Sequence, residues 1–164
     1  MGLDNGIILR TTKKLNIPEG YGIEYTHDLY EQYYNFDEKE WEIKATRFEH
    51  KYDFGYWRKC WNIRNLVRSI SMYFVEDGDT PLFKEDIDDL IKEFYKKNNP
   101  DVWGEDYDSG ETIWSVEDMR IMKPDDRNSY IYNDMRKLAI LAQMLDLLDD
   151  EPTGAYECYF YDSY

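Results

Sequence analysis

Strand and helix patterns follow one another along this sequence without the regular alternation that builds a parallel sheet. Helical periodicity covers residues 56–74, 81–97 and 133–149, and strand patterns cover residues 3–12, 41–52, 112–122 and 155–162. Because each parallel pair needs a long crossover, usually a helix, this order favours antiparallel pairing. The sequence therefore predicts an α+β fold with a mostly antiparallel sheet and about three helices, arranged as a single pair of layers.

The segments between these patterns are less regular. Residues 17–22 contain one proline and two glycines and predict a turn region. Residues 25–36 are acidic and rich in tyrosine, and their pattern leaves a short helix and a loop both open. Thr80 and Pro81 are residue types that favour the N-cap and first position of a helix, so we expect the second helix to begin there. Residues 104–110 predict an acidic loop.

The composition indicates one folded domain over residues 1–164. Hydrophobic residues make up 42% of the chain, and no linker rich in Gly, Ser or Pro divides it. The formal net charge of -15 disfavours general binding to duplex nucleic acid or to an anionic membrane, because phosphates would be repelled over most of the surface. The chain shows no secretory signal and no membrane-spanning stretch. We therefore expect a cytoplasmic protein in which Cys60 and Cys158 are free thiols.

A run of basic residues interrupts this acidity. Between Asp53 and Glu76 the chain has no acidic residue but four basic ones. If residues 56–74 form a helix, their apolar side chains make a core-facing stripe, and a second stripe beside it combines tryptophan with arginine. The core-facing positions are Cys60, Ile63, Val67, Ile70 and Phe74, and the second stripe is Trp57, Trp61, Arg64 and Arg68.

This second stripe suits a phosphorylated ligand with an aromatic base. A tryptophan ring stacks on the base, two arginines bind phosphate, and an asparagine reads a base edge or ribose hydroxyl. The surrounding acidity favours a small compact anion over a long polymer. The alternative is structural, because the same side chains can form ion pairs and cation–π contacts within their own chain. The predicted ligand-binding residues are Trp57, Arg58, Trp61, Asn62, Arg64, Asn65 and Arg68.

Motifs of known catalytic chemistry are missing from the sequence. It has no glycine-rich phosphate loop, no Gly-x-Ser-x-Gly, no His-Glu-x-x-His and no Cys-x-x-Cys. The two histidines, His27 and His50, lack a spaced ligand partner, and their spacing does not force them together. Carboxylate pairs occur throughout the chain, so none indicates an acid–base site. We expect a non-catalytic protein with no metal and no cofactor, while a hydrolase without a familiar motif stays open.

Three segments resemble a family of small phage and prophage proteins. They are the Gly-Leu-Asp of residues 2–4, the Gly-Tyr-Trp-Arg-Lys of residues 55–59 followed by Asn62 and Ile63, and the aromatic tail of residues 159–164. The resemblance implies a phage origin and work inside a bacterial host. It supplies no catalytic residue.

Two functions are consistent with these observations. In the first, the protein is a counter-defence factor that sequesters a small phosphorylated, nucleotide-type compound at the helix of residues 56–74. In the second, its carboxylates imitate nucleic acid and occupy a basic host nuclease or another defence protein. Both place the protein in the bacterial cytoplasm without direct contact with duplex nucleic acid or membrane, and both leave a homo-oligomer open.

Overall fold

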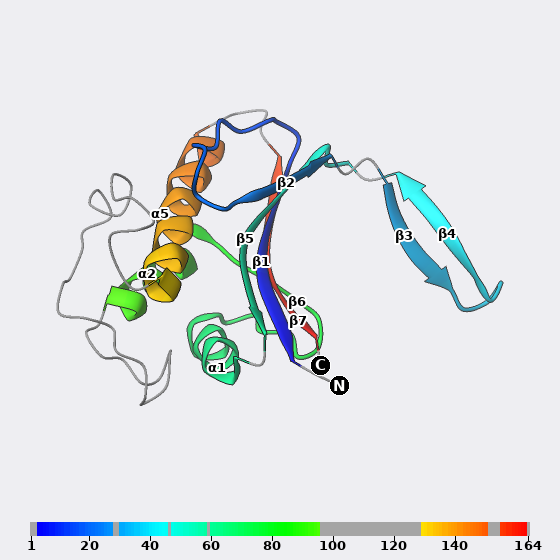
Figure 1. The fold of residues 1–164 in the computed structure, drawn as a ribbon. Helices are drawn as coiled ribbons and strands as arrows, with labels where there is room; N and C mark the ends of the chain where they lie inside the picture. The colour runs from blue at the N-terminus through cyan, green and yellow to red at the C-terminus, as the bar shows by residue number, and fades with distance from the viewer. Residues whose placement is uncertain are drawn as a thin grey trace.

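The computed structural model describes residues 3–27, 30–45, 47–58, 60–95, 129–150 and 155–163. Seven strands and three helices occur in these residues, and Figure 1 labels them. The strands are β1 (Asp4–Thr11), β2 (Glu24–His27), β3 (Tyr30–Asn35), β4 (Glu40–Ala45), β5 (His50–Arg58), β6 (Asp79–Pro81) and β7 (Tyr156–Ser163). The helices are α1 (Trp61–Ile70), α2 (Lys84–Tyr95) and α5 (Ser129–Asp149).

The main sheet has five antiparallel strands in the order β2-β5-β1-β7-β6. Strand β1 lies at its centre and pairs along its whole length with β5 on one side and β7 on the other. The predicted α+β class with an antiparallel sheet is therefore confirmed. The strands predicted at residues 3–12 and 155–162 are confirmed as well, as β1 and β7.

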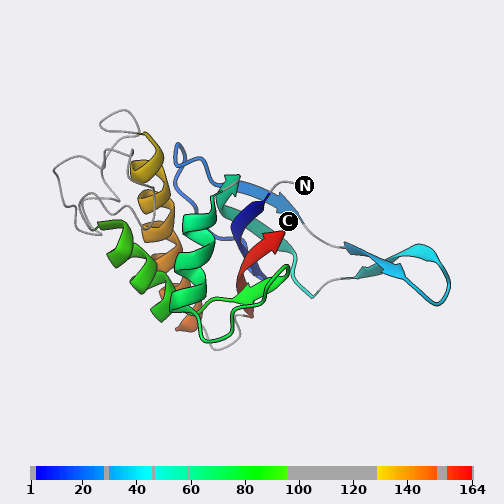
Figure 2. The same cartoon turned by 90° about the horizontal axis from the view of Figure 1, so that it is seen from below.

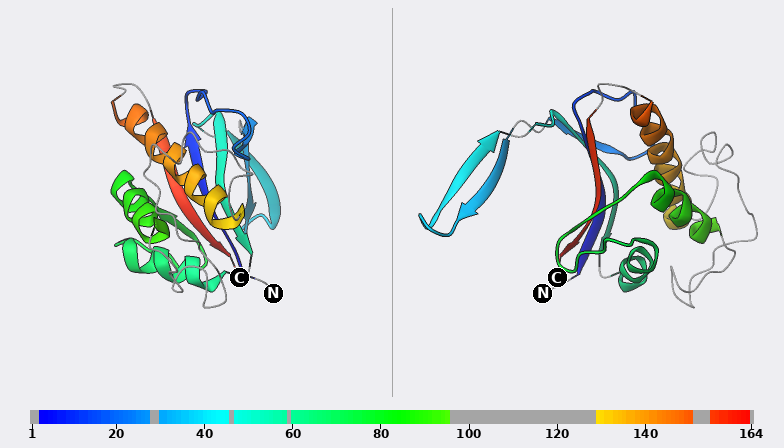
Figure 3. Two further views of the ribbon diagram at one scale, coloured as in Figure 1. Left: turned by 60° about the vertical axis from the view of Figure 1, so that its left-hand side comes forward. Right: turned by 180° about the vertical axis from the view of Figure 1, so that it is seen from behind.

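The three described helices lie on one face of the main sheet, as Figures 2 and 3 show. Side chains alternate along β1, so Ile7 and Leu9 point into the core beneath the helices, whereas Ile8 points to the opposite face. Strand β7 adds Phe160 to this core, and α5 adds leucines such as Leu138. The single pair of layers expected from the sequence is therefore a sheet with helices on one side.

Two of the predicted helices form but begin at other residues. Helix α5 confirms the helix predicted at residues 133–149 and begins one turn earlier. Helix α2 begins at Lys84, because Thr80 and Pro81 belong to β6. The side chain of Thr80 is fully buried and accepts a hydrogen bond from the Val75 backbone N–H at 2.7 Å, while its backbone pairs with Phe160. Pairing with β7 therefore makes Thr80 part of the sheet, and Thr80 does not cap helix α2.

The first helix is shorter than predicted, because β5 extends through its expected first turn. Strand β5 stays paired with β1 as far as the pair formed by Asp4 and Arg58, and a register shift in this ladder leaves Phe54 as a bulge. Helix α1 begins only after this ladder ends, and at its other end Ser71 adopts an extended conformation. The helix predicted over residues 56–74 is therefore wrong at both ends.

The segment that the sequence left open between a helix and a loop forms strands instead. Residues 25–36 contain most of β2 and the whole of β3. Strand β3 pairs with β4 in a separate two-stranded sheet, which projects on the side of the main sheet away from the helices (Figure 1). The strand predicted at residues 41–52 is divided between β4 and the start of β5.

The acidic loop predicted at residues 104–110 and the strand predicted at residues 112–122 lie outside the described residues. Cys60 and Cys158 both belong to the described part of the chain and are free thiols. Among the described helices, none combines the length and the apolar character that a membrane crossing requires.

Candidate protein interface

The predicted ligand-binding residues are divided between a strand and a helix. Two of them end β5 and five belong to α1, namely Trp57 and Arg58 on the strand and Trp61, Asn62, Arg64, Asn65 and Arg68 on the helix. Because Trp57 lies in extended backbone, it cannot continue a helical stripe with Trp61. The predicted stripe of two tryptophans and two arginines is therefore wrong.

Arg64 belongs to a buried ion-pair network. The residue is only 4% exposed, and its Nε lies 3.0 Å from each carboxylate oxygen of Asp162 on β7. Its Nη2 donates to Oε1 of Glu76 at 3.0 Å. The guanidinium carbon also lies 5.4 and 5.3 Å from the ring centroids of Trp61 and Phe74. For Arg64 the structure therefore agrees with the structural alternative, in which the arginine forms ion pairs and cation–π contacts within its own chain.

Asp162 explains why α1 is held against the sheet. Its side chain is fully buried, and besides Arg64 it accepts a hydrogen bond from Asn5 Nδ2 at 2.8 Å and one from the Asp77 backbone N–H at 2.9 Å. These three donors, Arg64 Nε, Asn5 Nδ2 and the Asp77 N–H, satisfy the buried carboxylate without water. The network joins α1, β1, β7 and the loop that follows α1.

Trp57 is a core residue. It is buried, and its indole lies over Gly55, where a Cβ atom would come within 2.6 Å of the ring. Its Nε1 donates to a carboxylate oxygen of Asp134 on α5 at 2.9 Å. Burial raises the pKa of the Asp134 carboxyl to about 6, although this hydrogen bond and Lys137 act in the opposite direction. In this position the indole is not available to stack on a base.

A smaller part of the basic run remains at the surface. Trp61 is 49% exposed, and Asn65 and Arg68 follow it at helical spacing as exposed residues of α1. Arg58 is exposed at the end of β5, whereas Asn62 is half-buried. Ligand binding by these residues stays a prediction. The paired and buried Arg64 no longer supplies the phosphate clamp on which that prediction depended.

Exposed apolar side chains gather on the hairpin arm, which we define as β3, β4 and the turn of residues 36–39. Figures 1 and 3 show this arm projecting from the body on the side of the main sheet opposite the helices. Six of the fourteen exposed large hydrophobic residues in the described part of the chain belong to it. Large side chains in this position are not part of the core and need another explanation.

The register of the arm separates its side chains into two chemically different faces. Residues directly opposite each other in an antiparallel pair share a face. One face, which we call the aromatic face, carries no charge and consists of Tyr30, Gln32, Tyr34, Trp41, Ile43 and Ala45. The other, which we call the polar face, includes Tyr33, Asn35, Glu40, Glu42 and Lys44.

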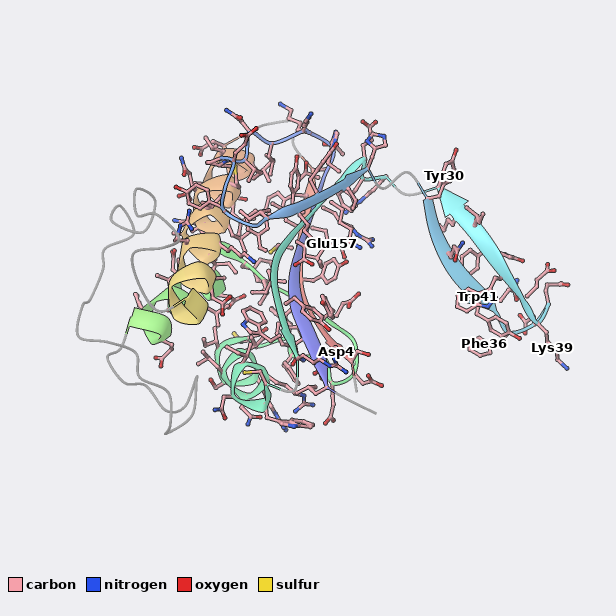
Figure 4. The ribbon with its side chains drawn as sticks, viewed as in Figure 1. Asp4, Tyr30, Phe36, Lys39, Trp41 and Glu157 are labelled. Atoms are coloured by element: carbon pink, nitrogen blue, oxygen red, sulfur yellow. The ribbon has the colours of Figure 1, made fainter. Side chains whose placement is uncertain are left out.

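The aromatic face is exposed rather than packed on the body. Trp41 is 69% exposed and Ile43 is 68% exposed. Tyr34 lies 5.6 Å from Trp41 and 4.9 Å from Phe36 between ring centroids, both in edge-to-face orientation. Figure 4 shows Phe36 and Trp41 together near the outer end of the arm, with Lys39 at its tip. The rings therefore preorganise one another as a contact surface.

The polar face and the turn hold the arm in shape. Asn35 Oδ1 accepts hydrogen bonds from the backbone N–H groups of Asp37 and Glu38, which forms an Asx turn. Glu42 accepts hydrogen bonds from the Tyr33 hydroxyl and from Asn35 Nδ2. A two-stranded hairpin alone is marginally stable in water. These local bonds therefore order the arm without using its aromatic face.

The main sheet also has an open face, which we define as the side away from the helices. Asp4 and Glu157 lie on this face, and Figure 4 labels both. A pocket of about 340 Å³ occupies part of it. The pocket is lined by Ile8, Glu24, Thr26, Lys51, Asp53, Asp79, Tyr159 and Tyr161.

The cysteines and histidines of the described residues are the remaining groups with catalytic potential. Burial raises the pKa of the Cys60 and Cys158 thiols, which suppresses the reactive thiolate. The sheet does bring His27 and His50 together as a cross-strand pair with ring centroids 5.4 Å apart, which their spacing in the sequence did not indicate. Among the described residues, no group of three or more His, Cys, Asp or Glu side chains could hold a metal ion.

No family model, no curated protein and no solved structure matches this chain. Its function is therefore argued from its own surfaces. The arm is the surface that the sequence interpretation missed. Alternation of polar and apolar residues at 40–45 was a signal for it.

Proposed function

We propose that this protein is a non-catalytic binding protein that docks on another protein through the aromatic face of its hairpin arm. The observation that carries the proposal is an ordered, amphipathic hairpin whose uncharged face lies in solvent. Aromatic residues dominate the energetics of protein interfaces, because they bury a large area at a low cost in conformational entropy.

The size of the aromatic face is adequate for an anchor. Tyr34, Trp41 and Ile43 of this face and Phe36 of the adjoining turn are all exposed, and full burial of a large apolar side chain contributes about 1.5–3 kcal/mol. Association itself costs about 4–15 kcal/mol in lost freedom of motion. The four side chains together offset the lower part of this range where the partner offers a complementary apolar patch, and further contacts around them supply the rest.

The charge around this face favours a basic partner over a second copy. The arm contains five acidic and two basic residues, and the whole chain has a net charge of -15. Self-association through the arm would bring two strongly acidic bodies together, whereas a partner with a basic rim gains electrostatic attraction at the same contact. Basic surfaces are typical of proteins that bind nucleic acid. An inhibitor of a nuclease or another basic defence protein in a bacterial host fits this chemistry.

Sequestration of a nucleotide at α1 is less well supported. The expected clamp required Arg64 and Arg68 side by side at the surface, and the guanidinium of Arg64 is already paired with Asp162 and Glu76. Trp57 is buried as well. We therefore place the binding surface on the arm.

Affinity capture from bacterial lysate with three baits tests the proposal. The first bait is the unchanged protein, and the second carries Trp41→Ser with Ile43→Ser on the aromatic face. The third carries Glu40→Gln with Lys44→Gln, which alters the polar face of the same strand and leaves the net charge unchanged. Bound proteins are quantified by mass spectrometry at low and high salt, because rim charges weaken with screening.

We expect a basic protein to be enriched on the first and third baits, to be lost from the second, and to bind more weakly at high salt. Equal capture by the first and second baits would contradict the proposal, as would capture no better than bare resin. Light scattering on the purified protein adds a further check. A dimer that disappears in the Trp41→Ser, Ile43→Ser variant would make a second copy the occupant and overturn the proposed partner.

A further inference from the structure

The pocket on the open face combines tyrosine rings with carboxylates. Tyr159 and Tyr161 lie two residues apart on β7 and therefore point to the same side of the sheet. The ring of Tyr161 lies directly over Gly6, where a Cβ atom would come within 2.4 Å of it. Because glycine leaves this space, the ring packs flat against the sheet and forms a fixed aromatic wall.

The lining of the pocket has an excess of negative charge. It contains three carboxylates, those of Glu24, Asp53 and Asp79, and one ammonium, that of Lys51. Burial raises the pKa of the Asp53 carboxyl and that of the Asp79 carboxyl. The Gly55 N–H, Lys137 and Lys51 act in the opposite direction on Asp53, and Arg10 does so on Asp79, but burial has the larger effect on both. A further cationic group in the pocket would stabilise the charged forms of both carboxylates.

We infer that this pocket binds a guanidinium group. The guanidinium carbon of Arg10 on β1 lies 5.6 Å from the centroid of the Tyr159 ring, so the open face already holds one guanidinium against one of these rings. A guanidinium is flat, weakly hydrated and carries a fork of N–H donors, so it stacks on a tyrosine while it donates to a carboxylate. An ammonium offers only a compact, strongly hydrated charge.

Two sources could supply this group. One is an arginine side chain of the protein partner, in which case the pocket would anchor the partner beside the arm, and this reading rests on the proposed function. The other is a small free guanidine compound, which needs no partner protein. Both share the chemistry that the pocket recognises.

Calorimetric titration with matched probes tests the inference. The probes are N-acetyl-L-arginine methyl ester, its isostere N-acetyl-L-citrulline methyl ester, which has no side-chain charge, and the capped peptide Gly-Arg-Gly. The pocket variant carries Asp53→Asn with Asp79→Asn. The control variant carries Asp4→Asn with Glu157→Gln, which also removes two negative charges from the open face, but outside the pocket lining. Thermal melts confirm that both variants are folded.

We expect the arginine ester to bind and the citrulline ester not to bind. The pocket variant should weaken binding of the arginine ester at least about tenfold, the effect of losing one charge-assisted hydrogen bond, while the control variant should change it less than about twofold. Equal binding of the two esters, or equal binding by the two variants, would overturn the inference. Tighter binding of the peptide than of the ester identifies a protein side chain as the source, and the reverse identifies a small guanidine. Because the Trp41→Ser, Ile43→Ser variant leaves the pocket intact, its titration separates failure of the pocket from failure of the arm.

Discussion

Replacement of Arg64 by methionine should destabilise the protein strongly. Methionine keeps a long apolar stem but has no charge, so the substitution leaves the carboxylate of Asp162 buried with two neutral donors, Asn5 Nδ2 and the Asp77 N–H. The side chain of Asp162 is fully buried, and water therefore cannot replace the guanidinium without opening the network. The ligand-binding interpretation of the sequence instead required Arg64 to be available at the surface.

The magnitude follows from the burial of this pair. Removing one partner of a buried ion pair costs about 3–5 kcal/mol, because the remaining charge loses its compensation. For a chain of this size each kcal/mol lowers the melting temperature by about 2–4 °C, so the expected decrease is about 6–20 °C. Arg68→Met is the matched control. It removes the same side chain from an exposed position of the same helix and should change the stability by less than about 0.5 kcal/mol.

Urea unfolding followed by circular dichroism measures both variants. A double-mutant cycle with Asp162→Asn then isolates the pair. The double variant should be more stable than the Arg64→Met variant, because the new amide is neutral and Asn5 can rotate its unpaired Oδ1 to accept from it. The reasoning fails if Arg64→Met costs no more than Arg68→Met, or if the cycle shows no coupling.

Two further predictions concern the core beneath Trp57. Asp134→Asn should remove a pH dependence of folding stability. The Asp134 carboxyl has a raised pKa of about 6 in the folded state, whereas in the unfolded state it loses its proton near pH 4. The stability of the parent protein therefore falls as the pH rises from about 4 to 6, by up to about 3 kcal/mol. Between pH 4 and pH 7 the parent should lose about 2 kcal/mol of stability relative to the variant, as measured by unfolding at both pH values, and an equal change in both proteins would contradict the assignment. Gly55→Ala should cost about 1–3 kcal/mol, because the new Cβ would lie 2.6 Å from the Trp57 ring, and an unchanged urea midpoint would show that the ring can move.

The elements that could be predicted from the sequence are those with a local signal. Helix α5 shows a leucine-rich apolar pattern over several turns, and β1 and β7 are short, apolar or aromatic runs bounded by turns. Errors occurred where a distant segment overrode a local preference. Thr80 has the composition of a helix cap, but pairing with Phe160 makes it part of β6. The Arg58 end of β5 reads as a helix start, but pairing with β1 extends the strand.

The candidate site was less predictable than the fold, because its residues depend on long-range contacts. Spacing places Arg64 on a stripe, but it does not reveal Asp162, which is 98 residues away in the sequence. The arm lacked the usual hairpin signal, since its turn of residues 36–39 contains no glycine and Lys39 instead adopts the positive φ of 55°. Tyr33 also places an aromatic ring on the polar face and so blurs the alternation.

Site-specific photo-crosslinking from the arm tests the proposed interface most directly. A photoreactive phenylalanine derivative is placed at position 43 on the aromatic face, or at the neighbouring position 44 on the polar face. With bacterial lysate, position 43 should crosslink to a basic protein and position 44 should not. Crosslinks from position 44 alone, or from both positions only to other copies of this chain, would show that the aromatic face does not bind a basic partner.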